Sequence, residues 1–137
     1  MKQQLLITIA AVVLVGCAST QLSESPTVKA PDISIHKAAD DGNIEAVKQH
    51  IAAGTDVNAK VGAGETPLHN AIRLGNTEIA GLLIANGADV NAKFDDGING
   101  HTALDIATSC LWRRPETASL LRKHGAKTAE ELKTEGK

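Results

Sequence analysis

Aromatic side chains are almost absent from this sequence of 137 residues. Phe94 and Trp112 are the only two, and there is no tyrosine. Strands favour aromatic and β-branched residues, so a core without aromatics must be built from Leu, Ile, Val and Ala. The composition therefore predicts layered small helices and argues against a sheet sandwich.

Long apolar runs are also missing. The longest occupies residues 5–15, which is too short to cross a bilayer because a spanning helix needs about 20 apolar residues. It follows Lys2 and leads into small residues before Cys17. A basic residue, a short apolar segment and small residues at its end are typical of an export signal.

The tetrapeptide Leu14-Val15-Gly16-Cys17 resembles the lipobox of bacterial lipoproteins. This resemblance implies that residues 1–16 are cleaved and that Cys17, acylated with chains such as palmitate, anchors the mature chain. Two or three acyl chains hold stably, because each buried methylene contributes about 0.8 kcal/mol and one chain is marginal. Ala18 follows in place of Asp, which by the same resemblance favours the outer over the inner membrane, with the chain facing the periplasm. The alternative is an ordinary secretory signal with an incidental cysteine.

The net charge gives no reason to expect nucleic acid as a partner. Cleavage after residue 16 removes one basic residue, Lys2, and leaves 13 basic and 16 acidic residues, a net charge of −3. Binding to nucleic acid calls for a basic stripe. About 120 residues remain, enough for one domain.

Cysteine is as rare as the aromatics. Once Cys17 is acylated, Cys110 has no partner for a disulfide within the chain. Its neighbours Leu104, Ala107 and Leu111 indicate a helical stretch in which Cys110 is a small buried residue. A nucleophilic role or a disulfide between two copies is the less favoured alternative. Trp112 is expected to pack over Leu111, with a binding anchor as the alternative.

What the chain does have is an internal repeat. Asp56-Val57-Asn58-Ala59-Lys60 recurs unchanged 33 residues later as Asp89-Val90-Asn91-Ala92-Lys93. A fixed period of this length indicates stacked copies of one small structural unit. Stacked arrays expose long variable faces, so binding to a partner is expected in preference to catalysis.

The middle copy predicts two short helices. Thr66 is a suitable N-cap and Pro67 a favoured first helical residue, and Leu68, Ala71 and Ile72 then share one face. Gly75 ends this helix. The second helix begins at Thr77, buries Ile79, Ala80, Leu82 and Leu83, and ends at Asn86-Gly87.

These residues resemble a full ankyrin repeat, through Gly64-x-Thr66-Pro67-Leu68-His69-x-Ala71, Gly75-Asn76-x-Glu78-Ile79, Leu82-Leu83 and Gly87-Ala88-Asp89-Val90-Asn91. The resemblance implies an all-α solenoid of about three helix-turn-helix repeats with short hairpin loops. The expected units are residues 32–60, 61–93 and 94–128, after a tether at 17–31 and before a polar tail at 129–137. In that tail, Glu130, Glu131 and Leu132 could add one turn of helix.

The end units depart from this pattern. In the first, Lys37, Asp40, Lys48 and Gln49 are expected to form the polar exterior of an end repeat. In the third, Asp105 stands where the repeat has histidine. Three residues are inserted in the loop 94–99 and two in the segment 109–115. Insertions in repeats map to loops, often on the binding side.

The five histidines, His36, His50, His69, His101 and His124, lack the spacing of a metal site. The resemblance implies a structural role for the repeat histidine, which bonds the threonine hydroxyl and loop backbone. No catalytic motif or cofactor site is expected. The rival hypothesis is an envelope enzyme or metal carrier that uses His101, Asp105 and Cys110.

The resemblance further implies that a protein partner binds at the hairpin tips and the exposed side of each first helix. Apolar residues at such positions point to a partner. By position, the expected surface consists of Asp40, Asp41, Lys60, Val61, Glu65, Arg73, Leu74, Lys93, Phe94, Ile98, Asn99, His101 and Ser109. The predicted function is a monomeric, lipid-anchored adaptor in the bacterial cell envelope. The alternative is an inhibitory or immunity protein for an envelope enzyme or toxin.

Overall fold

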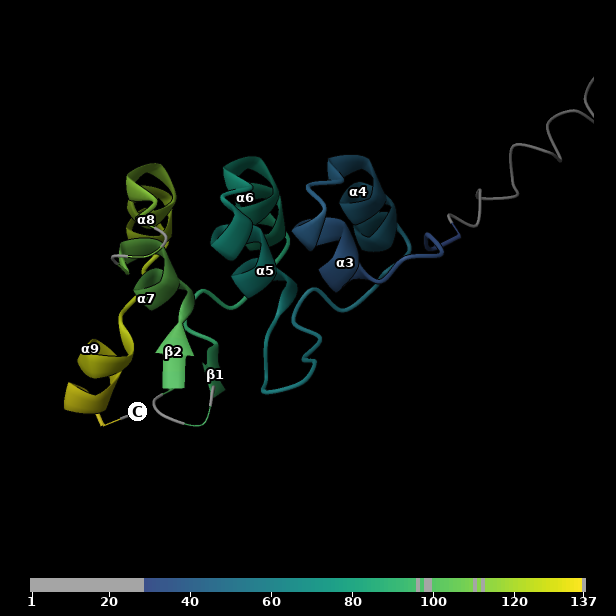
Figure 1. Ribbon diagram of the computed structural model, residues 1–137. Coiled ribbons are helices and arrows are strands. Elements are labelled where there is room, and N and C mark those ends of the chain that lie inside the picture. The colour runs from purple at the N-terminus through teal and green to yellow at the C-terminus, as the bar shows by residue number, and fades with distance from the viewer. Residues whose placement is uncertain (1–28, 96, 98–99, 110, 112, 137) are drawn as a thin grey trace, which may run out of the picture.

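The described part of the chain folds as a row of three helix pairs, which Figure 1 shows side by side. The computed structural model describes residues 29–95, 97, 100–109, 111 and 113–136. The pairs are α3 (Ile35–Asp40) with α4 (Ile44–Ala52), α5 (Pro67–Leu74) with α6 (Thr77–Ala85), and α7 (Ala103–Thr108) with α8 (Pro115–Lys123). A last helix, α9 (Ala129–Thr134), follows. The predicted all-α solenoid is confirmed.

Helix α5 begins and ends where the sequence predicts. Thr66 is its N-cap, and a capping box pairs Thr66 with His69 at the third helical position. Pro67 occupies the first turn, where its missing N–H costs no hydrogen bond. Gly75 closes the helix in the left-handed conformation at φ 81°, which glycine adopts without a Cβ penalty. Local chemistry thus sets both ends of the element.

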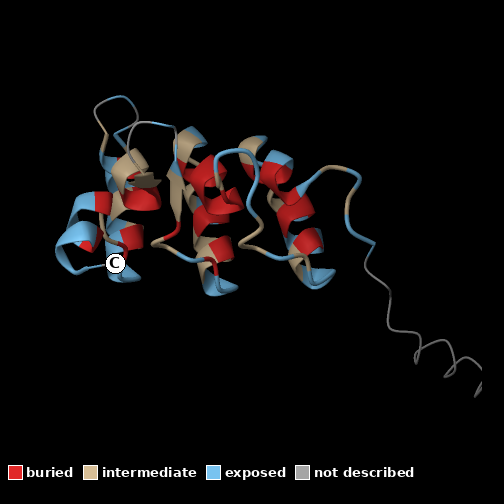
Figure 2. Ribbon diagram, turned by 90° about the horizontal axis from the view of Figure 1, so that it is seen from below, coloured by how far each residue is buried: buried red, intermediate tan, exposed pale blue. Residues whose placement is uncertain are grey.

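The core runs through all three helix pairs (Figure 2). First helices pack on first helices, α3 on α5 and α5 on α7, and each also packs on its own second helix. The predicted face of Leu68, Ala71 and Ile72 is completely buried, as are Ala80 and Leu83. Leu82 was expected in the core but is only partly buried, since it packs at the edge of this cluster.

The loop insertion in the third unit lengthens a β-hairpin. Strand β1 (Lys93–Asp95) pairs antiparallel with β2 (Gly100–Thr102), and Phe94 lies opposite His101. The preceding loop is shorter, with a single bridge between Val61 and Glu65. The backbone N–H of Asp95 donates to the carbonyl of Ala63 at 2.9 Å, which joins the two loops.

The repeated pentapeptide links successive units through its asparagine. The side chain of Asn58 donates to the Gly87 carbonyl at 3.0 Å and accepts from the Asp89 N–H at 2.8 Å. One unit later, Asn91 donates to the Gly125 carbonyl at 3.3 Å and accepts from the Lys127 N–H at 2.8 Å. The asparagine recurs because each copy satisfies the backbone of the next unit.

The segment predicted as a polar tail contains α9, a helix of six residues where the sequence predicted a single turn. Thr128 and Glu131 form a capping box at its start, and the Thr128 N–H lowers the pKa of the Glu131 carboxyl. Ala129 and Leu132 are buried. Figure 1 shows α9 beside β2, on the side away from α5. The tail therefore belongs to the folded body as far as residue 134.

Candidate functional site

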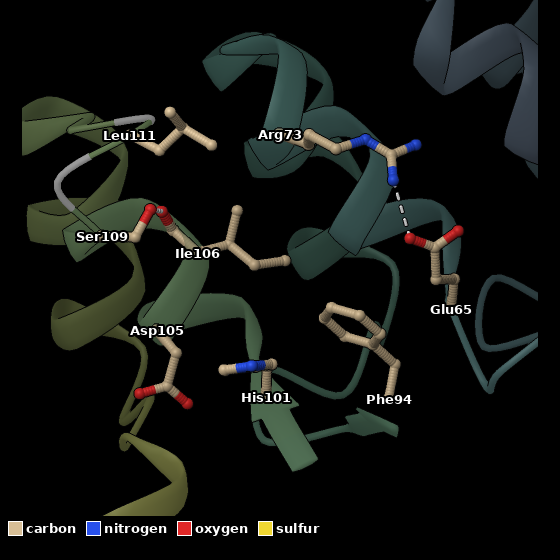
Figure 3. Close-up of a pocket in the computed structure, with 8 residues that line it drawn as sticks. All are labelled: Glu65, Arg73, Phe94, His101, Asp105, Ile106, Ser109 and Leu111. Carbon is tan, nitrogen blue, oxygen red and sulfur yellow. Dashed lines mark hydrogen bonds and ion pairs between the residues drawn. The ribbon is translucent and has the colours of Figure 1, made fainter. Parts of the chain in front are cut away.

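An open pocket of about 320 Å³ lies between the second and third helix pairs (Figure 3). Five of its residues were predicted as surface from the sequence: Glu65, Arg73, Phe94, His101 and Ser109. Three were not: Asp105, Ile106 and Leu111. We call these eight residues the groove. Its volume is at the small end of the range for ligand pockets, which suits one large side chain better than a cofactor.

The wall of the groove is mainly apolar. The Phe94 ring lies edge-on to His69, with centroids 5.0 Å apart, and tilted against His101 at 5.8 Å. Phe94 is thus half-buried, whereas the sequence placed it as an exposed residue. Ile106 is half-buried, and Leu111 is 81% exposed. A surface leucine this exposed, in the same pocket as an aromatic ring, offers apolar area to a partner.

Arg73 forms a charged rim along one side of the groove. Its Nη1 lies 2.7 Å from Glu65 Oε1, and its Nη2 lies 3.5 Å from Asp40 Oδ1. The three side chains are between 26% and 35% exposed. One guanidinium therefore faces two carboxylates, and the rim carries a net negative charge. Asp40 comes from α3, so the rim also joins the first unit to the second.

The other described residues that the sequence predicted as surface do not line the groove. Val61 and Leu74 are 46% and 43% exposed, as expected for contact positions. Lys60 and Asp41 are exposed, and Asp41 pairs with Lys37. Lys93 is half-buried in β1. Ile98 and Asn99 lie outside the described residues, as does the predicted lipidation site Cys17.

The repeat histidines hold loops in place. His69 Nε2 donates to the Ala92 carbonyl at 3.1 Å, while its Nδ1 accepts from the Thr66 N–H at 3.1 Å. His36 Nε2 donates in the same way to the Ala59 carbonyl at 2.9 Å. Burial lowers the pKa of His69 to about 4, so its ring is neutral at pH 7. The expected structural role is therefore seen at both positions.

In the third unit Asp105 takes the place of this histidine, and its side chain accepts a hydrogen bond from the following segment where the histidine donates one. Its Oδ2 accepts from the N–H of Thr102 and from the N–H of Ala129, both at 2.8 Å. A histidine ring at this position would donate to a loop carbonyl. The carboxylate instead accepts from the first residue of α9, and Figure 3 shows it turned away from the groove. Asp105 therefore positions the start of α9.

The geometry of three stacked helix pairs with linked loops agrees with a comparison against protein families. It matches residues 35–131 to ankyrin repeats, in three copies. The chain belongs to the ankyrin-repeat family. Repeats of this family are protein–protein interaction modules and are typically not enzymatic. The search of curated proteins finds no match for this ankyrin-repeat chain.

A second pocket of this ankyrin-repeat protein is lined by the adjacent basic residues Arg113 and Arg114. Arg113 is exposed, but the Arg114 guanidinium packs over Gly75, where an added Cβ would lie 2.6 Å from Arg114 Cζ. Thr77 and Thr117 share a hydrogen bond at 2.7 Å beside it. Arg114 thus joins the second unit to the third.

The helix expected to include Cys110 ends earlier, at Thr108. Ser109 departs from helical geometry, and the carbonyl of Ala107 accepts from the Arg114 N–H at 2.8 Å. Leu111 consequently lies outside any helix and is exposed, which corrects the prediction that it belongs to this helical stretch. Cys110 and Trp112 themselves lie outside the described residues.

Within the described part of the ankyrin-repeat chain, no three His, Cys, Asp or Glu side chains gather in a way that could hold a metal ion. The same residues include no helix with the length and apolar character needed to span a bilayer.

Proposed function

We propose that this protein is a lipid-anchored adaptor of the bacterial cell envelope that binds a protein partner in the groove. The observation that carries the proposal is an apolar wall of half-buried Phe94, half-buried Ile106 and exposed Leu111 in a member of a family of interaction modules. Buried apolar and aromatic anchors contribute most of the energy of protein interfaces. The envelope location is supported by the sequence pattern from Lys2 to Cys17.

Affinity capture from envelope extracts tests the adaptor function. We expect the wild-type protein to retain a defined partner and the double variant I106E/L111E to lose it, because two carboxylates in the groove oppose burial of an apolar side chain. The matched control is S119E, which adds a charge at an exposed position of α8. It should capture as the wild type does.

Folding and binding are separated by thermal unfolding of each variant. The capture result counts only for variants whose unfolding temperature stays near that of the wild type. A folded I106E/L111E that still retains the partner would overturn the proposal. If the captured partner is an enzyme or toxin that loses activity on binding, the adaptor would give way to the inhibitor hypothesis.

A further inference from the structure

The groove lies where the three units differ from one another, not where they agree. At one position of the first helix the units carry exposed Lys37, buried Asn70 and half-buried Ile106. One turn later they carry Asp40, Arg73 and Ser109. The identical positions, such as Asn58 and Asn91, bond the units together. Residues that break the repeat are therefore free to specify a partner.

The differing positions run from charged to apolar along the array. The first unit presents Asp40 and Asp41, with Lys37 paired to Asp41. The third presents Ile106, Ser109 and the exposed Leu111. Arg73 lies between them and faces the two carboxylates of Asp40 and Glu65. One end of this face thus offers apolar side chains, and at the other end the two carboxylates of Asp40 and Glu65 share one guanidinium.

We propose that the groove receives a partner segment in which a large apolar side chain lies about 10 Å from a lysine or arginine. The inference rests on the proposed binding function and names the chemistry of the partner. The apolar side chain occupies the space between Phe94, Ile106 and Leu111. The cation completes the charge balance at Asp40 and Glu65, whose side chains are 35% and 26% exposed, so that water screens the charge only in part.

The spacing follows from the packing of the array. Neighbouring helices pack about 8–10 Å apart, so the acidic rim between α3 and α5 lies one such step from the apolar site between α5 and α7. An extended segment covers this distance in about three residues, at roughly 3.3 Å each. A helix covers it in about seven residues, at roughly 1.5 Å each, which returns the two side chains to the same face.

Selection of random 16-residue peptides displayed on phage tests this chemistry without knowledge of the natural partner. We expect peptides selected on the wild-type protein to share a large apolar residue and a lysine or arginine at one of these spacings. Synthetic copies should bind at least tenfold more weakly when the apolar residue becomes Ala or the basic residue becomes Glu. They should not bind the I106E/L111E variant.

The acidic rim has its own matched variants. D40N/E65Q should weaken these peptides about tenfold, whereas E45Q/E78Q, which removes two exposed carboxylates from α4 and α6, should leave affinity unchanged. Thermal unfolding shows whether D40N/E65Q remains folded. If D40N/E65Q does not fold, the affinity of the wild-type protein for the peptide whose basic residue is replaced by Glu tests the role of the acidic rim instead. The inference would be overturned if the selected peptides shared acidic residues, or if they bound I106E/L111E and D40N/E65Q as tightly as the wild type. It would also be overturned if no selected peptide required the groove for binding.

The two proposals fail in different ways. Peptides of the expected kind together with an empty envelope capture would overturn the adaptor function and leave the groove chemistry standing. A captured partner whose binding ignores D40N/E65Q and competes with none of the peptides would leave the adaptor standing and overturn the chemistry.

Discussion

His69 shows how a titratable residue serves packing in this fold. It is 1% exposed, donates to one loop and caps the helix that carries it. Its ring can do both only while neutral, because Nδ1 must accept. A histidine at the surface can act as a pH switch. Here burial gives His69 a structural role, which it loses when acid protonates the ring.

Acid should therefore destabilise the protein through His69. Burial lowers the pKa of His69 to about 4 in the fold, against about 6.5 in an unfolded chain. The contribution of the neutral ring is complete above pH 6.5 and is lost as pH falls toward 4, because the unfolded state binds the proton first. The total loss is about 3 kcal/mol at 1.36 kcal/mol per pKa unit. Urea unfolding across this range measures it.

Two variants separate His69 from the other histidines. H69Q should remove most of this pH dependence, at a cost in stability at pH 7. H124Q, which changes an exposed histidine, should keep the wild-type profile. An unchanged slope in H69Q would show that other groups control the acid response.

Gly75 illustrates a residue fixed by both backbone and neighbour. Its φ of 81° is left-handed, and a Cβ would meet the Arg114 guanidinium at 2.6 Å. Gly87 has a φ of 91° but nothing within 4 Å of the same added atom. The two glycines therefore differ only in what lies beside them.

We expect G87A to lower the free energy of unfolding by about 1–2 kcal/mol, the cost of a left-handed alanine. G75A should cost more, because Arg114 must also leave its contact. The double variant G75A/R114A should lose less free energy of unfolding than G75A and R114A lose in sum, because without the Arg114 side chain the added methyl group meets no guanidinium. Denaturant unfolding of G87A, G75A, R114A and G75A/R114A checks this, and equal effects of G75A and G87A would contradict it.

At the scale of the element, α9 replaces the hairpin that would follow in a further unit. The asparagine link from Asn91 reaches Lys127, and the chain then enters a helix at Ala129 instead of repeating the pentapeptide. Asp105 receives the first N–H of that helix. The departure of the third unit from the histidine pattern and the presence of α9 are thus one structural change.

Removal of the Asp105 carboxylate should release α9. D105A removes the Asp105 half of the α7 capping box and the acceptor of the Ala129 N–H. The loss of a capping side chain typically costs about 1 kcal/mol. Hydrogen exchange should rise in residues 129–134 while α5 and α6 stay protected. The control T134A changes an exposed residue of α9 without touching its start. Unchanged protection of α9 in D105A would contradict the assigned role of Asp105.

Much of the element structure was predictable because it is local. Thr66, Pro67 and Gly75 specify the ends of α5 by their own backbone preferences, and the 33-residue period specifies the stacking. The packing of α9 was less visible, because Glu130 and Glu131 mask the spacing of the buried Ala129 and Leu132. The end of α7 at Thr108 depends on contacts with Arg114 from a later segment, which no local pattern reveals.

At the scale of the whole molecule, the groove is assembled from segments that the sequence keeps apart. Glu65, Arg73, Phe94, His101 and Ser109 were predicted one position at a time, and the structure brings them together. The half-burial of Phe94 results from its pairing with two histidines on different elements. Ile106 was not predicted. Alignment of the three units places it opposite Lys37 and Asn70, and this change from polar to apolar is a signal that the sequence contains.

Attachment to a membrane is a property of the whole chain that remains a prediction. In a bacterial host, we expect the wild-type protein to sediment with membranes and to carry the mass of acyl chains on its first residue. C17S should lack that mass. The control C110S should keep both properties, because Cys110 lies in the third unit. Wild-type protein without acyl mass would contradict the anchor and leave the groove untouched.

Because α9 covers the C-terminal end of the array, a further repeat unit can be added more easily at some positions than at others. A copy of the middle unit inserted between residues 60 and 61 would meet compatible partners on both sides, since Asn58 and Asn91 offer the same bonds. A copy appended after residue 128 would first have to displace α9 from Asp105. Lineages or engineers that lengthen this protein should therefore succeed by duplication within its interior and fail by extension at its tail.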